Sequence, residues 1–288
     1  RTLGRGITVR GREHLATVED ECRSVPGVSV IVHDQECAIE KRRRRRSGAD
    51  PAPRELIVIN ERICEGCGDC GRKSRCLAVQ PVATKWGLKT RISQSNCNDD
   101  ASCLQGTCPA FTLVRPEGDI RRQESDAGGV RIPEFQFSPD GFCLRLLGVG
   151  GTGIVTVSQI LANAASIDGL KVRALDQTGL ARKGGAVVSD LHFTRETTDR
   201  PPSAAAGEVH VYAGCDPLVA LDERFLNVAD PKSTVAVLST SVIPTGEMVL
   251  EHKLTALDAV EIKHETRSRF ARTSVLDTVA LAKDWLRD

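Results

Sequence analysis

The stretch Cys64-Glu65-Gly66-Cys67-Gly68-Asp69-Cys70 carries three cysteines at intervals of three residues, on a glycine-rich segment that favours a loop. Thiolates at this spacing wrap one corner of an iron–sulfur cubane, because each binds a different iron, and a remote fourth cysteine closes the site. In proteins that hold two such clusters, a proline follows that remote cysteine. Pro109 follows Cys108 in this way. The pattern therefore predicts one [4Fe–4S] cluster on Cys64, Cys67, Cys70 and Cys108.

Three more cysteines lie in the same segment, namely Cys76, Cys97 and Cys103. They leave a four-cysteine site one ligand short. The open alternatives are a three-iron cluster, a four-iron cluster with a non-cysteine ligand such as Asp99 or Asp100, or packing alone. Zinc is a weaker alternative, because zinc ligands usually arrive as two separated C-x2-C pairs. An odd count of seven cysteines without an export signal disfavours a disulfide framework.

The composition is that of an ordinary globular protein. The chain has 288 residues, 39 Lys+Arg against 38 Asp+Glu, and 40% hydrophobic and 27% charged residues. These values predict about two domains and exclude collagen-like and wholly disordered chains. The most apolar window, residues 146–165, contains four glycines and several polar residues, so no membrane span is expected. Without an export signal, the expected location is the cytoplasm.

The N-terminal residues predict an incomplete α/β unit. Residues 13–22 have a helical pattern, and residues 28–32 are a run of apolar and small residues that predicts a buried strand. A helix and a strand are too little to bury a core alone. Because the chain also starts at Arg1 and has its only methionine at Met248, we expect an internal fragment.

Six consecutive cations, Lys41 to Arg46, follow this remnant. The run and the Pro-containing stretch after it predict a linker. A docking surface for an acidic protein and a nucleic-acid patch are the alternatives. The protein as a whole is not basic and the run has no interleaved aromatic residues, so no nucleic-acid partner is expected.

The rest of the chain alternates strand and helix patterns after the cysteine-rich segment. We expect an iron–sulfur domain over residues 55–115, a linker over 116–141 and an α/β domain over 142–288. Its elements are expected as strands at 142–147, 172–175, 186–193, 209–213 and 234–238 and helices at 154–165 and 273–286. This order predicts an open, Rossmann-like α/β sheet with crossover helices. No internal repeat is evident.

A glycine loop, Gly148-Val149-Gly150-Gly151-Thr152-Gly153, joins the first of these strands to its helix. Such a turn lets backbone amides approach an anion, so Gly148, Gly150 and Gly153 are candidate ligand contacts. Asp176 then stands where a dinucleotide site places its ribose-binding acid. A second glycine loop over residues 177–185 adds Arg182 and Lys183 as candidate anion contacts. A dinucleotide, another phosphorylated ligand, and a packing or interface role all stay open.

Three stretches resemble one family, the fused indolepyruvate ferredoxin oxidoreductases, which belong to the 2-oxoacid:ferredoxin oxidoreductases. They are Val28–Arg46, Ile59–Cys70, and the segment from Gln177 to Ser189 that reads QTGLARKGGAVVS. The resemblance implies the family's domain order: residues 1–54 would be the tail of the thiamine-diphosphate domain plus a linker, followed by a ferredoxin-like domain and a gamma-type domain. The irregular seven-cysteine spacing looks like the family's own.

The resemblance also implies an activity for the whole enzyme. That activity is oxidative decarboxylation of a 2-oxo acid with coenzyme A, with electrons relayed through iron–sulfur clusters to ferredoxin. Thiamine diphosphate and Mg²⁺ would bind a Gly-Asp-Gly…Asn motif that this sequence does not contain, so the fragment alone is expected to be inactive. The remaining domains of the same polypeptide are expected partners, as is a second copy in a homo-oligomer. The glycine loop would not be a nicotinamide site.

Two alternative functions, from other classes of protein, stay open. One is an NAD(P)- or flavin-linked reductase with a fused ferredoxin domain, and the other is a metal-stabilised nucleic-acid-binding module. No residue is expected to act as a catalytic acid or base, because the six histidines are scattered without metal spacing. Each histidine is expected to be structural or solvated.

Overall fold

The computed structural model describes the chain in ten stretches: residues 6–34, 40–41, 43–44, 47–49, 55–94, 96–105, 108–115, 141–179, 184–255 and 257–286. It divides into two compact units, Arg1–Ala52 and Pro53–Asp288. The linker expected over residues 116–141 lies outside the described residues except for Gly141, and its prediction stays a prediction. In the described part of the chain, no helix combines the length and apolar character that a membrane crossing requires.

The first unit contains a short 3-10 helix, η1 (Arg12–His14), and the helix α1 (Leu15–Ser24). The predicted helix is confirmed, although none of its residues is buried. The predicted buried strand at residues 28–32 is wrong, because this segment forms no strand and Val28 is 93% exposed. A strand needs a neighbour to satisfy its backbone N–H and C=O groups, and the described part of this unit offers none.

Residues 55–115, here called the cysteine domain, contain two antiparallel strand pairs. β1 (Leu56–Ile59) pairs with β4 (Phe111–Val114), and β2 (Val79–Thr84) pairs with β3 (Gly87–Ile92). Two short helices, α3 (Asp69–Ser74) and η2 (Ser102–Leu104), complete it. Its core has few apolar residues, and five of the cysteines pack around it, namely Cys64, Cys70, Cys76, Cys97 and Cys103.

Residues 141–286, here called the α/β domain, contain a six-stranded sheet of order β10-β9-β8-β5-β7-β6. Its strands are β5 (Phe142–Val149), β6 (Lys171–Thr178), β7 (Ala186–Thr194), β8 (Val211–Gly214), β9 (Val235–Ser239) and β10 (Arg272–Leu276). The strands β5, β8, β9 and β10 run parallel, whereas β7 is antiparallel to both β5 and β6. The prediction of an open α/β sheet is confirmed, with the difference that β6 and β7 form an antiparallel hairpin.

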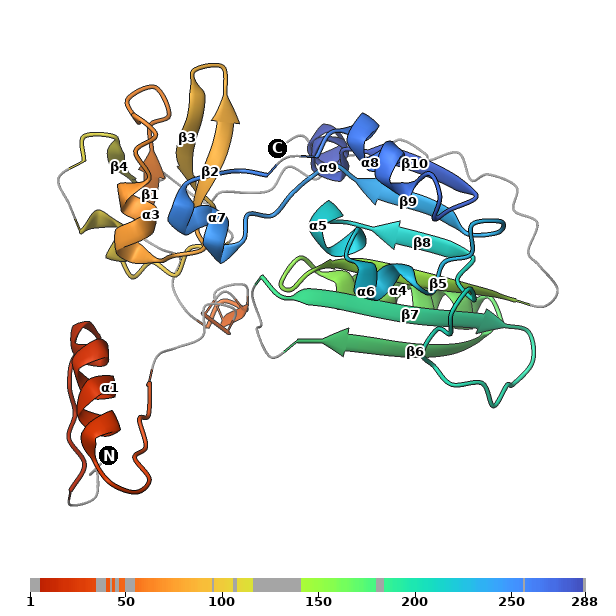
Figure 1. Cartoon of the computed structure of the whole chain (residues 1–288), viewed down its shortest axis with the longest axis horizontal. Coiled ribbons are helices and arrows are strands. Elements are labelled where there is room, and N and C mark those ends of the chain that lie inside the picture. Colours follow the sequence, from red (N-terminus) through yellow and green to blue (C-terminus); the bar gives the residue numbers. More distant parts are fainter. Residues whose placement is uncertain are drawn as a thin grey trace. The chain divides into compact units, whose positions relative to one another are not determined.

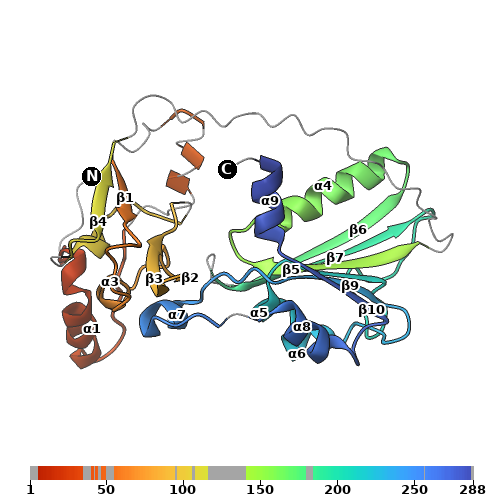
Figure 2. The same cartoon turned by 90° about the horizontal axis from the view of Figure 1, so that it is seen from above.

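Helices cover both faces of this sheet. Figure 2 shows α4 (Ile154–Ile167) and α9 (Thr278–Leu286) on one face and α5 (Pro217–Ala220), α6 (Glu223–Leu226) and α8 (Ala259–Thr266) on the other. The core between β8, β9 and these last helices includes the fully buried side chains of Tyr212, Leu238 and Ile262.

The closing helix predicted over residues 273–286 is wrong in its first part. Residues Arg272–Leu276 form β10, which pairs in parallel with β9, and the helix begins only at Thr278. Asp277 ends the strand and starts the helix, because its Oδ1 accepts hydrogen bonds from Val279 N at 3.0 Å and Ala280 N at 2.9 Å. The β-branched residues before Asp277 favour a strand once an edge is available for pairing.

A buried ion pair joins β5 to β7. Arg145 Nε and Nη2 donate to the two carboxylate oxygens of Asp190 at 2.7 and 2.8 Å, and both side chains are almost fully buried. Asp190 Oδ2 also accepts from Ala204 N at 2.9 Å. This paired charge explains how two ionic groups lie inside the sheet without an uncompensated desolvation cost.

The helix α7 (Gly246–Glu251) does not lie on the sheet of its own domain. It contacts α3 and β2 of the cysteine domain, beside which it is drawn in Figure 1. Thr245 begins the helix by accepting a hydrogen bond from Met248 N at 3.3 Å. A segment of the α/β domain therefore forms part of the surroundings of the cysteine loops.

Candidate metal centre

A tight turn after β1 positions the first cysteine loop. The carbonyl of Asn60 accepts hydrogen bonds from Ile63 N at 3.1 Å and Cys64 N at 2.9 Å. Gly66 and Gly68 then have φ angles of 73° and 71°, which favour glycine. A Cβ on Gly66 would lie 2.2 Å from the carbonyl oxygen of Leu88. Glycine at position 66 therefore allows the loop to pack closely against β3.

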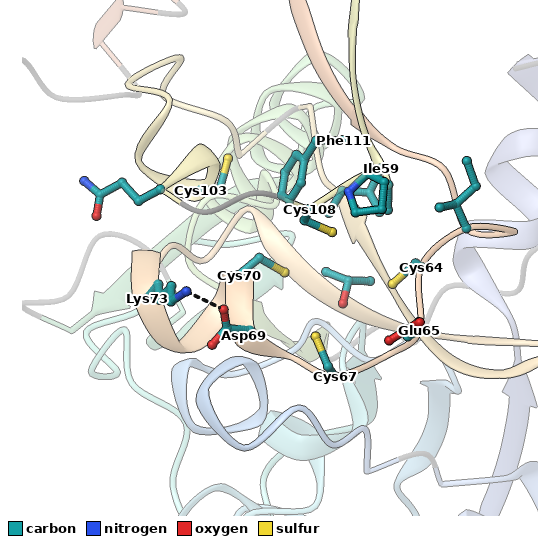
Figure 3. Close-up of a pocket in the computed structure, with 15 residues that line it drawn as sticks. Ile59, Cys64, Glu65, Cys67, Asp69, Cys70, Lys73, Cys103, Cys108 and Phe111 are labelled. Carbon is teal, nitrogen blue, oxygen red and sulfur yellow. Dashed lines mark ion pairs between the residues drawn. The ribbon is translucent and has the colours of Figure 1, made fainter.

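This loop and the segment before β4 bring together four of the predicted ligands. Cys64, Cys67, Cys70 and Cys108 line one cavity of about 280 Å³, and Figure 3 shows their sulfur atoms pointing into it. Cys103 also lines the cavity, but its sulfur points away from the other four in Figure 3. The volume is several times the ~30 Å³ that one water occupies in the liquid, so the space suits a group larger than a single ion.

The arrangement of the thiols differs from that of a mononuclear metal site. Among the described residues, no three His, Cys, Asp or Glu side chains converge on a common point as ligands of one ion would. All ten described cysteines are free thiols. In a cubane each thiolate binds a different iron, so the ligands are spread around the group and do not meet. The four cysteines around the cavity therefore fit a cubane by donor type and number.

Burial and nearby cations act in opposite directions on these thiols. Burial raises the pKa of Cys70, while a hydrogen bond from Thr90 lowers it. Lys89 Nζ donates to the carbonyl of Cys64 at 2.7 Å, and Arg72 Nη2 donates to the carbonyl of Cys67 at 2.9 Å. The two cations place positive charge at the backbone of the loop, where it favours thiolates and any anionic group that they bind.

A histidine from the α/β domain contacts the outer side of this loop. Thr90 is buried, lines the cavity and shares a hydrogen bond of 3.0 Å between its Oγ1 and Nε2 of His252. His252 ends α7 with a φ of 49°, and a Cβ on Gly68 would lie 2.4 Å from its own Cβ. Sequence reasoning missed this role and expected His252 to be structural or solvated. No local pattern marks it, because the contact depends on how the two domains fold together.

The other three cysteines form a second group. Cys76, Cys97 and Cys103 all pack against the small core of the cysteine domain. Burial is the largest cause that raises the pKa of Cys97, and it is also the largest cause that raises the pKa of Cys103 to about 11. The seven predicted cysteines are thus divided into a group of four whose sulfur atoms point into the cavity and a group of three, of which Cys103 also lines the cavity.

The glycine loop shows a packing role for one of its glycines. A Cβ on Gly148 would lie 2.6 Å from Cδ1 of Ile154, the first residue of α4. Gly150 N donates to the carbonyl of Gly185 at 2.7 Å, which joins the two glycine loops. Gly153 has a φ of 93° and begins α4. Arg182 and Lys183 lie outside the described residues, so an anion site formed by these two loops stays a prediction.

The surroundings of Asp176 differ from those of a dinucleotide site. Asp176 lies inside β6 and accepts a hydrogen bond from Ser189 Oγ at 2.5 Å. The antiparallel strand β7 separates β6 from β5, the strand that leads into the glycine loop. The two strands that carry the expected glycines and acid are therefore not neighbours in the sheet.

The sequence matches a family model over the α/β domain, and it matches curated proteins over part of its length. Residues 143–286 match the model of the family described as pyruvate ferredoxin/flavodoxin oxidoreductase. An indolepyruvate oxidoreductase subunit IorB from Archaeoglobus fulgidus is 34% identical over 117 residues, which are 40% of this chain and 55% of that protein. A pyruvate/ketoisovalerate oxidoreductase common subunit gamma from Pyrococcus abyssi is 32% identical over 149 residues, 48% of this chain and 76% of that protein.

Among solved structures, pyruvate oxidoreductase subunit PORC from Thermotoga maritima matches with a TM-score of 0.37 and 19% identity. The match covers 51% of this chain and 68% of that one. The gamma subunit of a keto/oxoacid ferredoxin oxidoreductase from Geobacter sulfurreducens matches with a TM-score of 0.33 and 18% identity, over 50% of this chain and 65% of that one.

Proposed function

Because this chain belongs to the pyruvate ferredoxin/flavodoxin oxidoreductase family, we propose that it carries the electron-relay part of a 2-oxoacid:ferredoxin oxidoreductase. The cysteine domain would hold a [4Fe–4S] cluster on Cys64, Cys67, Cys70 and Cys108, and the α/β domain would be its gamma-type partner. When bound, the cluster would take up and release one electron at a time. The observation that carries the proposal is that four sulfur atoms face one cavity.

The proposal extends to the enzyme as a whole. Two of the matched relatives are named indolepyruvate oxidoreductase subunits, which supports an indolepyruvate-type 2-oxo acid as substrate. Coenzyme A as acyl acceptor, thiamine diphosphate with Mg²⁺ in another domain, ferredoxin as electron acceptor, and assembly with further domains or a second copy are parts of the same proposal.

The residues around the cavity have defined tasks in this proposal. Gly66 N donates to Sγ of Cys64 at 3.4 Å, and such amide bonds stabilise the charge on sulfur. Lys89 and Arg72 hold the carbonyls of Cys64 and Cys67 and add positive charge. Each electron that enters makes the site more negative, so these groups favour reduction, whereas burial opposes it.

The test is anaerobic reconstitution of the 288-residue chain with iron and sulfide. We expect a brown protein with inorganic sulfide and a visible absorption that bleaches on reduction. Cys67→Ser should lower the bound iron and sulfide, because it removes one cavity ligand. Cys215→Ser is the matched control, since Cys215 is an exposed cysteine of the α/β domain and should leave both unchanged.

Three results would contradict the proposal. A colourless protein with stoichiometric Zn²⁺ and no sulfide would show a zinc site instead. Nicotinamide or flavin binding that disappears in Gly150→Asp would favour a reductase of another class. Salt-sensitive nucleic-acid binding that disappears when Arg42 to Arg46 are neutralised would favour the nucleic-acid alternative.

A further inference from the structure

The two cysteine loops of the cysteine domain have left-handed backbone conformations at equivalent positions. Cys97 and Cys103 follow Cys64 and Cys70 at the same interval of 33 residues (97 − 64 and 103 − 70). Gly66 and Gly68 have φ angles of 73° and 71°, and the residues at the equivalent places, Asp99 and Ala101, have φ angles of 53° and 54°. Both Gly68 and Ala101 directly precede a helical turn, α3 in the first loop and η2 in the second.

Hydrogen bonds repeat in the same way. Gly66 N donates to Sγ of Cys64 at 3.4 Å, and Asp99 N donates to Sγ of Cys97 at 3.4 Å. The turn that enters the first loop has Ile63 N bonded to Asn60 O at 3.1 Å. Its counterpart has Asn96 N bonded to Ser93 O at 3.0 Å.

The match continues beyond the loops. Val79 N donates to Cys76 O at 3.0 Å at the start of β2, and Phe111 N donates to Cys108 O at 3.3 Å at the start of β4. Cys76 and Cys108 are therefore equivalent. The order strand, loop, helical turn, cysteine, strand occurs twice, whereas sequence analysis found no repeat. The sequence hides it because Asp99 and Ala101 replace the glycines of the first loop.

The second copy keeps its conformation at an energetic cost. A non-glycine residue in the left-handed region is strained by roughly 1 kcal/mol or more, and this loop has two of them around one residue, Asp100. Such strain persists where the surrounding structure demands it. In the first loop the same conformation surrounds Cys67, whose sulfur points into the cavity.

Asp100 thus stands at the position of Cys67, and the second loop reads C-x2-D-x2-C. The first site takes its fourth cysteine, Cys108, from the second copy. The reciprocal exchange gives the second site Cys76 from the first copy. Cys76, Cys97 and Cys103 pack against the same small core of the cysteine domain, which agrees with this grouping.

We propose that Cys76, Cys97, Cys103 and Asp100 hold a second four-iron cluster, in which the carboxylate of Asp100 binds the iron that a cysteine would otherwise bind. Asp100 Oδ1 accepts hydrogen bonds from Ser102 N at 3.1 Å and Ser102 Oγ at 2.8 Å, which hold the side chain at the start of η2. This inference rests on the proposed function, because the same domain must bind iron and sulfide.

The oxygen ligand gives the site a chemical signature. Thiolates are soft ligands that suit iron–sulfur clusters, whereas a carboxylate is hard and holds its iron less firmly. Oxidation by ferricyanide takes one electron from the [4Fe–4S]²⁺ cluster, and the oxidised cluster releases one Fe²⁺ to leave [3Fe–4S]⁺. The second site should lose its fourth iron in this way before the first site, which has four cysteines, does so.

The test compares Asp100→Cys, Asp100→Ala and the control Asp99→Asn, since asparagine tolerates positive φ. The reconstituted chain and the control should bind about eight irons, four per cluster. Mild ferricyanide should then produce the electron paramagnetic resonance signal of a three-iron cluster. Asp100→Ala should show that signal without ferricyanide and bind about one iron fewer. Asp100→Cys should keep all its iron under mild ferricyanide. This increase in resistance to oxidation tests the proposal even if the alanine variant folds poorly.

Two results overturn the inference and leave the proposed function standing. One is a chain with only about four irons whose content does not change in Cys97→Ser, since a single cluster then accounts for all the iron. The other is an Asp100→Ala variant that keeps about eight irons and shows no three-iron signal. A chain that binds no sulfide at all overturns both the inference and the proposed function.

Discussion

Thr90 and His252 share a hydrogen bond of 3.0 Å between Oγ1 and Nε2, although 162 residues separate them in the sequence. Thr90 belongs to β3 and lines the cavity of the first cysteine loop, whereas His252 ends α7 of the α/β domain. The bond therefore connects the wall of the candidate cluster site to the domain that shows the family relationship. The shape of the loop depends on both domains.

His252→Ala is expected to destabilise the chain by about 1–3 kcal/mol, because it leaves the buried hydroxyl of Thr90 without this partner. Thr90→Val should lower the free energy of unfolding much less in the His252→Ala variant than in the unchanged chain. The measurement is urea unfolding of the two single variants and the double variant. Additive effects within about 0.5 kcal/mol would show that the two side chains are not coupled.

Gly68→Ala and Gly87→Ala form a matched pair for the close approach of His252. Both glycines have positive φ, 71° and 91°, but a Cβ on Gly87 would meet no atom within 4 Å, whereas on Gly68 it would meet His252. Each variant should lose about 1 kcal/mol through backbone strain. Gly68→Ala should lose a further 1–3 kcal/mol from overpacking and should load less iron. Equal losses in thermal unfolding and equal iron contents would contradict the close contact.

Lys89→Met is expected to make the reduction potential of the first cluster more negative. The ammonium group lies against the carbonyl of Cys64 and stabilises the extra negative charge of the reduced site. If the reduced site loses stabilisation on the order of 1 kcal/mol, the reduction potential of a one-electron couple falls by about 40 mV. Lys85→Met is the control, because Lys85 lies over the ring of Trp86 at 4.5 Å. Potentiometric titration should show a shift for Lys89 alone, and the absence of a shift would refute this electrostatic role.

The buried thiol of Cys143 should make the free energy of unfolding fall as the pH rises above about 8.5. Burial raises the pKa of its thiol to about 12, whereas an unfolded cysteine titrates near 8.5. Below about pH 8.5 both states keep the proton, so the stabilising effect is fully present. As the pH rises from there towards about 12, the unfolded chain releases the proton first, and stability falls by up to about 1.4 kcal/mol per pH unit.

Urea unfolding at pH 8.5 and pH 10 checks this sign. Between these two pH values, the free energy of unfolding of the unchanged chain should fall by about 2 kcal/mol more than that of Cys143→Ala. The comparison between the two proteins removes the contributions of the other cysteines, because both proteins contain them. An equal loss would show that the thiol of Cys143 titrates alike in the folded and unfolded states.

The sequence by itself determined the features that depend on neighbouring residues. The spacing of Cys64, Cys67 and Cys70 and the strand and helix patterns around the glycine loop come from local chemistry. They predicted a cysteine-rich loop and most strands of the α/β sheet. The glycines of the first loop also marked the backbone turns that the structure contains.

Only the tertiary structure decided what depends on partners distant in the chain. Residues 28–32 lack a strand neighbour and form no strand, whereas residues 272–276 find β9 and do. No pattern in the neighbouring sequence predicts the contact of His252 with the first loop or the equivalence of Asp100 with Cys67. Packing between segments distant in the chain sets the positions of these side chains and the φ angles of the loops. Pairing and packing are long-range interactions, so they decide these features even where the local pattern indicates something else.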